Sequence, residues 1–226
     1  MASRPAYQQV AEHLRGLVSS GERAPGERLA GEAELCERYG VSRSTVREAI
    51  RLLEAQHLVV TIRGTTGGTF VAQPETGRIS LDLGASLDVL IAHDALTVDQ
   101  ILEARRLLEV PAAGLAAERR SDSQLDELRQ CVADGRDANE QFHKVLLAAS
   151  GNPLVEVMCE PLFGVLRARL HRDEASADFW AAVDGDHRRL LELVEAGDVV
   201  GTAAEMERHL TSLADVYRQL DRAPVK

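Results

Sequence analysis

The spacing of apolar residues predicts three helices in the first part of the chain. Over residues 6–18 they recur every three or four positions, and a Ser-Ser-Gly sequence then ends the pattern. A shorter helix is predicted over residues 32–38, and Gly40 follows it where helices commonly end on a left-handed glycine. Ser42 can cap a third helix that runs to about Ala55. Two helices joined by a glycine-containing turn are typical of the helix-turn-helix motif.

A β-hairpin is predicted directly after the third helix. Residues 58–62 and 69–72 are rich in β-branched side chains, and the sequence RGTTGG separates them. Glycines between two such stretches permit the tight turn of a hairpin. In this position the hairpin would be the wing of a winged helix-turn-helix.

The rest of the pattern is helical, and no stretch alternates as a strand would. The predicted helices span residues 80–92, 97–119, 122–133, 138–150, 153–171, 174–196 and 198–221. Asp198 can cap the last of them. Hydrophobic residues make up 45% of the chain and aromatic residues only 4%, which favours aliphatic packing between helices. We therefore expect a mainly α protein, in which an all-α helical bundle follows the winged helix-turn-helix.

The length of 226 residues predicts two domains. Residues 72–78 are polar and contain proline and glycine, as linkers often do. We place the linker at residues 74–78, after a DNA-binding domain of residues 1–73 and before a helical domain of residues 79–222.

The charge of the chain is unevenly distributed, which changes what the net value of −10 implies. Residues 1–75 carry nine arginines and nine acidic residues, so the acidic excess lies wholly in the second domain. Residues 38–63 contain five arginines but only two acidic residues, Glu48 and Glu54. A local basic patch on an acidic protein is suited to specific binding of DNA.

The third predicted helix presents this basic patch on one side. Val46, Ile50 and Leu53 form its apolar stripe and leave the arginines on the opposite face. Arginine can bind guanine or phosphate, and hydroxyl groups at a helix N-terminus can bind phosphate. A solvated amphipathic helix would show the same charge spacing, but the turn before this helix and the hairpin after it favour DNA recognition.

The sequence LAGEAELCERYGVSRSTVREAIRLLEAQHLVVTIRGTTGGTFV resembles the winged helix-turn-helix of the GntR family. The resemblance implies that the hydroxyl residues and arginines at the start of the third helix, together with a glycine at the wing tip, contact operator DNA. With the two further arginines of the basic patch, the predicted DNA-binding residues are Ser42, Arg43, Ser44, Thr45, Arg47, Arg51, Arg63 and Gly64. Two positions depart from the family pattern, because Ala33 replaces a DNA-contacting arginine and Gly31 replaces a capping serine.

The second domain resembles the FadR-type, or FCD, effector domain of the same family. The resemblance is carried by ILEARRLLEVPAAGLAAER at residues 101–119 and NEQFHKVLLAASGNPL at residues 139–154. It implies a homodimeric repressor that releases operator DNA when a small organic acid or sugar acid binds. Activation instead of repression, and an acyl-chain ligand, are alternatives.

Three histidines lie on or beside apolar stripes of three predicted helices, so all three are expected to face inward. They are His143, His187 and His209. Asn139 precedes the first by one helical turn, where FCD domains of the metal-binding type usually have aspartate. Three imidazoles and one oxygen ligand suit a divalent transition metal, with zinc or nickel as the expected ion.

Three arginines are predicted to contact an anionic effector. Arg105 matches a family position that points into the pocket, although a salt bridge to Glu109 would explain it equally well. Arg167 and Arg169 are further candidates.

Two other interpretations of the histidines remain open. They can pack the core without metal, or they can form the site of a metal-dependent enzyme that activates water. No general base accompanies them, and an enzyme would leave the DNA-binding half without a purpose.

The compartment is predicted to be the cytoplasm. The three cysteines form no recognisable disulfide or zinc pattern, and the chain contains neither a secretory leader nor an apolar run long enough to span a membrane.

Overall fold

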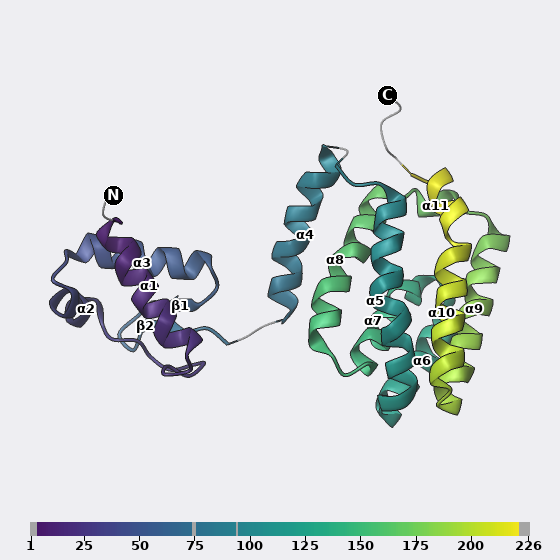
Figure 1. Cartoon of the computed structure of the whole chain (residues 1–226), viewed down its shortest axis with the longest axis horizontal. Helices are drawn as coiled ribbons and strands as arrows, with labels where there is room; N and C mark the ends of the chain where they lie inside the picture. Colours follow the sequence, from purple (N-terminus) through teal and green to yellow (C-terminus); the bar gives the residue numbers. More distant parts are fainter. Residues whose placement is uncertain (1–3, 74–75, 94, 222–226) are drawn as a thin grey trace. The chain divides into compact units, whose positions relative to one another are not determined.

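The computed structural model describes residues 4–73, 76–93 and 95–221, and the chain divides into two compact units between Glu75 and Thr76. Figure 1 shows the first unit as a small group of helices with a hairpin and the second as a bundle of helices. The predicted fold class, mainly α with an N-terminal winged helix-turn-helix, is confirmed.

The described residues of the first unit, 4–73, form three helices and a two-stranded sheet. The helices are α1 (Ala6–Ser19), α2 (Glu32–Tyr39) and α3 (Arg43–Ala55). The strands β1 (Val59–Ile62) and β2 (Gly68–Val71) pair antiparallel as the wing. The apolar stripes of all three helices meet in one core, so the two helices of the motif are held at a fixed angle.

The turn between α2 and α3 follows from two residues. Gly40 adopts φ 64° and ψ 32°, a left-handed conformation that glycine adopts without steric cost. Ser42 then caps α3, because its hydroxyl accepts a hydrogen bond from the backbone N–H of Thr45 at 3.2 Å. Both roles were predicted from the sequence, and both are confirmed.

The second unit is a helical bundle with two short 3-10 turns. Its elements are α4 (Thr76–Ala92), α5 (Val98–Arg119), α6 (Asp122–Asp134), η1 (Gly135–Ala138), α7 (Asn139–Ala149), α8 (Pro153–Arg169), η2 (Arg172–Glu174), α9 (Ala177–Ala196), α10 (Val199–Ser212) and α11 (Ala214–Gln219). Helix α5 packs against α7, α8, α9 and α10, and α4 packs against α8. Large side chains such as Phe142, Leu190 and Leu210 fill the centre.

The structure changes several predicted boundaries of these helices. The helix predicted over residues 174–196 begins only at Ala177, because Ser176 caps it by accepting a hydrogen bond from the backbone N–H of Phe179. The helix predicted over residues 153–171 ends at Arg169, because the backbone of Leu170 turns to an extended conformation. At that point Leu170 pairs with Asp221 in an isolated β-bridge.

Two further predictions need correction. The helix predicted over residues 198–221 is two helices, α10 and α11, which meet at Leu213. The predicted cap of the first is confirmed, because the Asp198 carboxylate accepts a hydrogen bond from the backbone N–H of Gly201 at 2.8 Å. Residues 76–78, predicted as linker, form the first turn of α4, and residues 74–75 lie outside the described residues.

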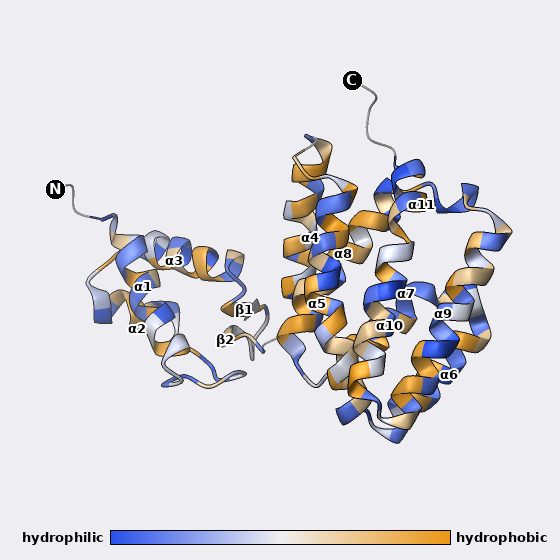
Figure 2. Cartoon of the chain, turned by 45° about the vertical axis from the view of Figure 1, so that its right-hand side comes forward, coloured by the Kyte–Doolittle hydropathy of each residue, from blue (hydrophilic) through white to orange (hydrophobic). Residues whose placement is uncertain are grey.

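The hydropathy of the surface is uneven. Figure 2 shows hydrophobic residues recurring along α4. Several of its apolar side chains are exposed, among them Ile79, Leu81 and Val89. In the part of the chain that the structure describes, no helix is both long enough and apolar enough to cross a membrane.

Candidate nucleic-acid interface and metal centre

The exposed face of α3 carries the predicted DNA-binding arginines. Arg43, Arg47 and Arg51 are all exposed. Arg47 lies 3.4 Å from a carboxylate oxygen of Glu32, and Arg51 lies at the same distance from Glu48. Exposed pairs of this kind are weak, so both arginines can exchange their partner for a phosphate or a base edge. Arg43 forms no ion pair within the described residues.

The N-terminus of α3 brings three hydroxyl groups together. The Ser42 hydroxyl lies 2.8 Å from the hydroxyl oxygens of Ser44 and Thr45. Ser42 and Ser44 are exposed and Thr45 is half-buried. The positive end of the helix dipole and these hydroxyl groups favour a bound phosphate.

The wing places the remaining predicted residues beside α3. Arg63 and Gly64 are exposed, and Gly64 adopts φ 119°, which favours glycine. A groove of about 310 Å³ runs between the wing and α3, and Arg47, Arg51 and Arg63 contribute to its lining. The structure therefore brings Arg47 and Arg51 of the helix and Arg63 of the wing to one groove, which Glu32 and Glu54 also line, whereas Arg43 does not line it.

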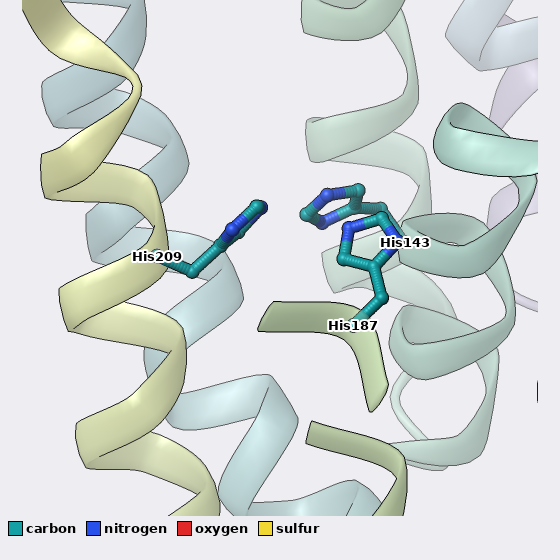
Figure 3. A group of neighbouring side chains, drawn as sticks. All are labelled: His143, His187 and His209. Atoms are coloured by element: carbon teal, nitrogen blue, oxygen red, sulfur yellow. The ribbon is translucent and has the colours of Figure 1, made fainter. Parts of the chain in front are cut away.

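The three predicted histidines converge in the second unit. They come from α7, α9 and α10, and Figure 3 shows their rings pointing toward one another. One nitrogen of each lies within 4.8 Å of the others. The side chains are buried, with exposed fractions of 2% for His143, 2% for His187 and 0% for His209. The Phe142 ring stacks on His187 with a centroid distance of 4.1 Å and fixes its orientation.

Two carboxylates orient the histidine rings. The Nδ1–H of His143 donates a hydrogen bond to Glu109 at 2.6 Å, and that of His209 donates to Asp186 at 3.1 Å. Burial alone would raise the pKa of Glu109, but Arg105 and His143 lower it to about 2. Burial would likewise raise the pKa of Asp186, yet hydrogen bonds from His209 and Arg208 lower it to about 2. Both carboxylates are therefore ionised acceptors, which leaves the Nε2 lone pairs of the two rings free.

The imidazoles of His143 and His187 are neutral at physiological pH. Burial lowers the pKa of His143 to about 4 against the attraction of Glu109. Burial also lowers the pKa of His187 well below its usual value, and the neighbouring histidines add to this effect. Neutral imidazole is the form that binds a metal ion.

The histidine cluster offers buried nitrogen atoms, unpaired among the described residues, that suit a metal ion. The Nε2 atoms of His187 and His209 are buried and have no hydrogen-bond partner among the described residues. Buried polar atoms normally have a partner, so two such atoms in one cluster require an explanation. Converging imidazole nitrogens, with carboxylates on the opposite nitrogens, are typical of metal sites.

Asn139 lies beside this cluster but already has a partner. Its side chain is 7% exposed and borders the same small pocket as His143. The amide oxygen accepts a hydrogen bond from Nη2 of Arg172 at 2.5 Å. The predicted oxygen ligand is thus close to the histidines, but its oxygen is bound by an arginine.

The three arginines predicted to bind an effector lie in different surroundings. Arg105 is buried, borders the pocket at His143 and pairs with Glu109 at 2.5 Å. Arg167 is exposed and pairs with Glu140. Arg169 is buried, where it pairs with Asp221 and donates to the Leu96 carbonyl oxygen. Arg167 and Arg169 do not line the pocket at His143.

Sequence reasoning missed three residues of the site. Glu109 was recognised only as a partner of Arg105, although it also accepts the hydrogen bond of His143. Asp186 precedes His187 in the chain but contacts His209 on another helix. Arg172 lies in η2, outside any helical stripe. The contacts of Asp186 and Arg172 cross between elements, so no spacing in the sequence signals them.

The fold and the two candidate sites define a class of protein, the transcriptional regulators that join a winged helix-turn-helix to a separate helical domain. Residues 6–71 match the family described as bacterial regulatory proteins, gntR family, and residues 100–212 match the FCD domain. The chain belongs to the GntR family of transcriptional regulators and carries an FCD domain.

Individual relatives agree with this membership. The chain is 31% identical over 215 residues to the HTH-type transcriptional regulator LutR of Bacillus subtilis, an alignment covering 88% of this chain and 95% of LutR. It is 31% identical over 218 residues to the galactonate operon transcriptional repressor of Escherichia coli, covering 90% and 91%. A solved structure described as Streptococcus agalactiae GntR matches with a TM-score of 0.58 at 24% identity, covering 94% of this chain and 99% of that one, and supports the fold.

These comparisons also decide between the alternatives for the whole chain. The two family models that match this chain describe transcriptional regulators, and both of these relatives are transcriptional regulators. The alternative of a metal-dependent enzyme is therefore not supported.

Proposed function

We propose that this protein is a homodimeric repressor of a metabolic operon, and that a small carboxylate bound at a metal ion in the FCD domain controls its affinity for operator DNA. The observation that carries the proposal is the histidine cluster. Its nitrogens converge within 4.8 Å, and two of them are buried without a partner among the described residues.

The DNA-binding half of the proposal rests on one surface of the first unit. The α3 face, its N-terminal hydroxyl groups and the wing offer charged and polar groups to a duplex. The proposed contacts are Ser42, Arg43, Ser44, Thr45, Arg47, Arg51, Arg63 and Gly64. Helix α3 would enter the major groove, and the wing would contact the flanking backbone.

The metal ion would be held by His143, His187 and His209. Three imidazoles suit zinc or nickel and leave coordination positions that a carboxylate can occupy. When bound, the metal supplies a positive charge that attracts an anionic ligand. Asn139 is the proposed fourth ligand, but it would first have to release Arg172. It would supply no negative charge, which increases the need for an anionic effector.

The carboxylate is supported by the arginine at the site and by a relative's name. Arg105 borders the pocket at His143 and remains the proposed effector contact there. Arg167 and Arg169, which lie outside that pocket, are weaker candidates. Galactonate, whose operon gives one relative its name, is itself a sugar acid.

The second copy of the chain is proposed to bind the apolar face of α4. Leu81 is 75% exposed, Val89 is 59% exposed and Ile79 is 55% exposed. A helix that exposes several large apolar side chains is typical of a protein interface. In a dimer, two α3 helices would have to meet half-sites about one DNA turn apart, so a change at the interface can weaken operator binding.

The test is metal analysis of the purified protein, combined with a thermal-shift screen of small carboxylates with and without chelator. Near-stoichiometric metal and a stabilisation that the chelator abolishes would support the proposal. If the protein contains no metal and none can be loaded, the histidines pack the core and the metal-anchored sensor is wrong. The DNA-binding assignment would then stand.

A further inference from the structure

One arginine beside the histidine cluster has no carboxylate to neutralise it. Arg172 is half-buried in η2, and its Nη2 donates to the amide oxygen of Asn139 at 2.5 Å. Within the described residues it forms no ion pair, and its Nε–H is buried without a hydrogen-bond partner. A half-buried guanidinium that faces a neutral amide, with one buried N–H unpaired, can still bind an anion.

The other arginines near the site differ from Arg172 in this respect. Arg105 pairs with Glu109, and Arg167 pairs with Glu140 at 2.7 Å. Arg169 pairs with Asp221 at 2.5 Å. Each of these positive charges is already compensated, so a carboxylate would have to compete with an internal one. At Arg172, by contrast, an added carboxylate would displace only the neutral amide oxygen of Asn139.

Arg172 contributes to the lining of two pockets. An inner pocket of about 10 Å³ borders His143, Asn139 and Tyr217, and an outer pocket of about 600 Å³ borders Trp180. Arg172 lines both pockets. The inner volume holds no more than about one water molecule. The inner pocket therefore has to widen before an organic effector can reach His143, and Arg172 is the lining residue that it shares with the outer pocket.

The outer pocket adds a second unpartnered donor. Trp180 is 7% exposed, and its Nε1–H is buried without a partner among the described residues. The Arg172 guanidinium lies 5.3 Å from the centre of the Trp180 ring. Asp137, Asp173 and Glu174 also line this pocket, but within the described residues none of them forms an ion pair with Arg172. Two buried N–H donors close together favour an acceptor with more than one oxygen.

We propose that Arg172, in addition to Arg105, recognises the carboxylate of the effector, and that effector binding breaks the hydrogen bond between Arg172 and Asn139. A carboxylate presents two oxygens that match the planar fork of guanidinium, which a single amide oxygen does not. Release of Arg172 would free the Asn139 oxygen and open the inner pocket toward the histidines. The inference rests on the proposed carboxylate sensor and names its specificity-determining residue.

The experiment compares three forms of the metal-loaded full-length protein: wild type, Arg172→Gln and Arg136→Gln. Arg136 is the matched control, because it lies 4.8 Å from the centre of the same Trp180 ring but pairs with Asp173. The probes are L-lactate, malonate and galactonate at up to millimolar concentration, with lactamide as an uncharged analogue. Calorimetry measures affinity, and fluorescence of Trp180, the single tryptophan of the chain, reports movement of Arg172.

The inference predicts that Arg172→Gln weakens binding of the best carboxylate by about tenfold to a hundredfold. Metal content should stay unchanged, and Arg136→Gln should bind within about twofold of wild type. Arg172→Lys should recover part of the affinity, because it keeps the charge but lacks the fork. The carboxylate should also change Trp180 fluorescence in the wild type, whereas lactamide should not.

Two results would overturn the inference, and they are distinguishable. If Arg172→Gln binds the carboxylate as tightly as wild type, Arg172 does not recognise it and the proposed sensor stands. If the metal-loaded wild type binds none of the three acids, both the sensor and the role of Arg172 are wrong.

Discussion

A buried chain of charges supports the histidine site at the scale of single residues. Arg105 pairs with Glu109, and Glu109 in turn accepts the hydrogen bond of His143. Arg105 and Glu109 are each 2% exposed, so neither charge is compensated by water. Breaking such a pair from one side leaves an isolated buried charge, which is far costlier than losing an exposed pair.

Replacing Arg105 should therefore destabilise the second unit strongly. We expect Arg105→Met to lower the free energy of unfolding of the metal-free protein by about 3–5 kcal/mol, because Glu109 loses its buried counter-charge. Urea unfolding followed by Trp180 fluorescence measures this unit directly, since Trp180 lies in α9.

The control for this variant is Arg167→Met, which breaks an arginine–glutamate pair whose arginine is 64% exposed. Its cost should be no more than about 1 kcal/mol. An equal loss in the free energy of unfolding for Arg105→Met and Arg167→Met would show that the buried pair stabilises the unit no more than the exposed pair.

A second feature at the scale of single residues is an alanine in the DNA-binding unit, at a position where the family pattern has an arginine. Ala33 is exposed in the first turn of α2, where the family pattern has an arginine that contacts DNA. Ala33→Arg should tighten operator binding and steepen the dependence of log K on log salt by about 0.9, the value for one added phosphate contact. Fluorescence anisotropy over a salt series measures both quantities.

Ala33→Gln adds length without charge and should leave the salt dependence unaltered. An unchanged salt slope in Ala33→Arg would mean that position 33 does not face the phosphate backbone.

At the scale of elements, the turn between α2 and α3 sets the angle of the proposed recognition helix. Its geometry depends on Gly40, whose φ of 64° is costly for any residue with a Cβ atom. Gly16 provides the contrast, because it lies inside α1 without a positive φ, and apart from its chain neighbours and the backbone of its own helix no atom lies within 4 Å of the point that a Cβ would occupy. The same substitution should thus have opposite effects at the two glycines.

We expect Gly40→Ala to destabilise the first unit by about 1–2 kcal/mol, because alanine is strained in the left-handed region. Gly16→Ala should stabilise it by about 0.5–1 kcal/mol, because alanine favours the helix. Hydrogen exchange of the α2 and α3 amides in the full-length protein measures both changes. A stabilising Gly40→Ala would contradict the role given to this turn.

The sequence allowed the elements to be predicted where a single residue ends or begins a helix. Gly40, Ser42 and Asp198 act through their own backbone or side chain, so their positions were predicted correctly. The break at Leu213 was missed because its backbone keeps helical angles, φ −72° and ψ −24°. The histidines were predictable because they share apolar stripes, whereas the contact of Asp186 with His209 depends on how two helices pack.

At the scale of the whole molecule, the two units have separate cores and separate chemistry. The proposed DNA-binding surface lies in the first unit, and the histidine cluster lies in the second. A substitution in the cluster should therefore change metal binding and effector response without removing the ability to bind DNA. This separation is what a regulator controlled by a ligand requires.

His187→Ala tests this separation. We expect its metal content to fall at least about tenfold and its response to carboxylates to disappear, because one of the three proposed ligands is lost. Operator binding by the variant should remain close to that of wild type. Elemental analysis and anisotropy with operator DNA measure the two effects, and His93→Ala, at an exposed position, is the control.

Unfolding of His187→Ala together with loss of DNA binding would favour the core-packing interpretation of the histidines. A circular dichroism spectrum of each variant distinguishes that outcome from a folded protein that lacks metal.

The small inner pocket has a consequence for the timing of the response. A space of about 10 Å³ behind Arg172 cannot admit an effector by diffusion alone. On the proposed mechanism, association has to wait for the side chain to leave, which lowers the on-rate below that of an open site. Dissociation is slowed by the same barrier. The protein would then respond to the average concentration of its effector over the lifetime of the complex, and brief fluctuations would leave the operon unaffected.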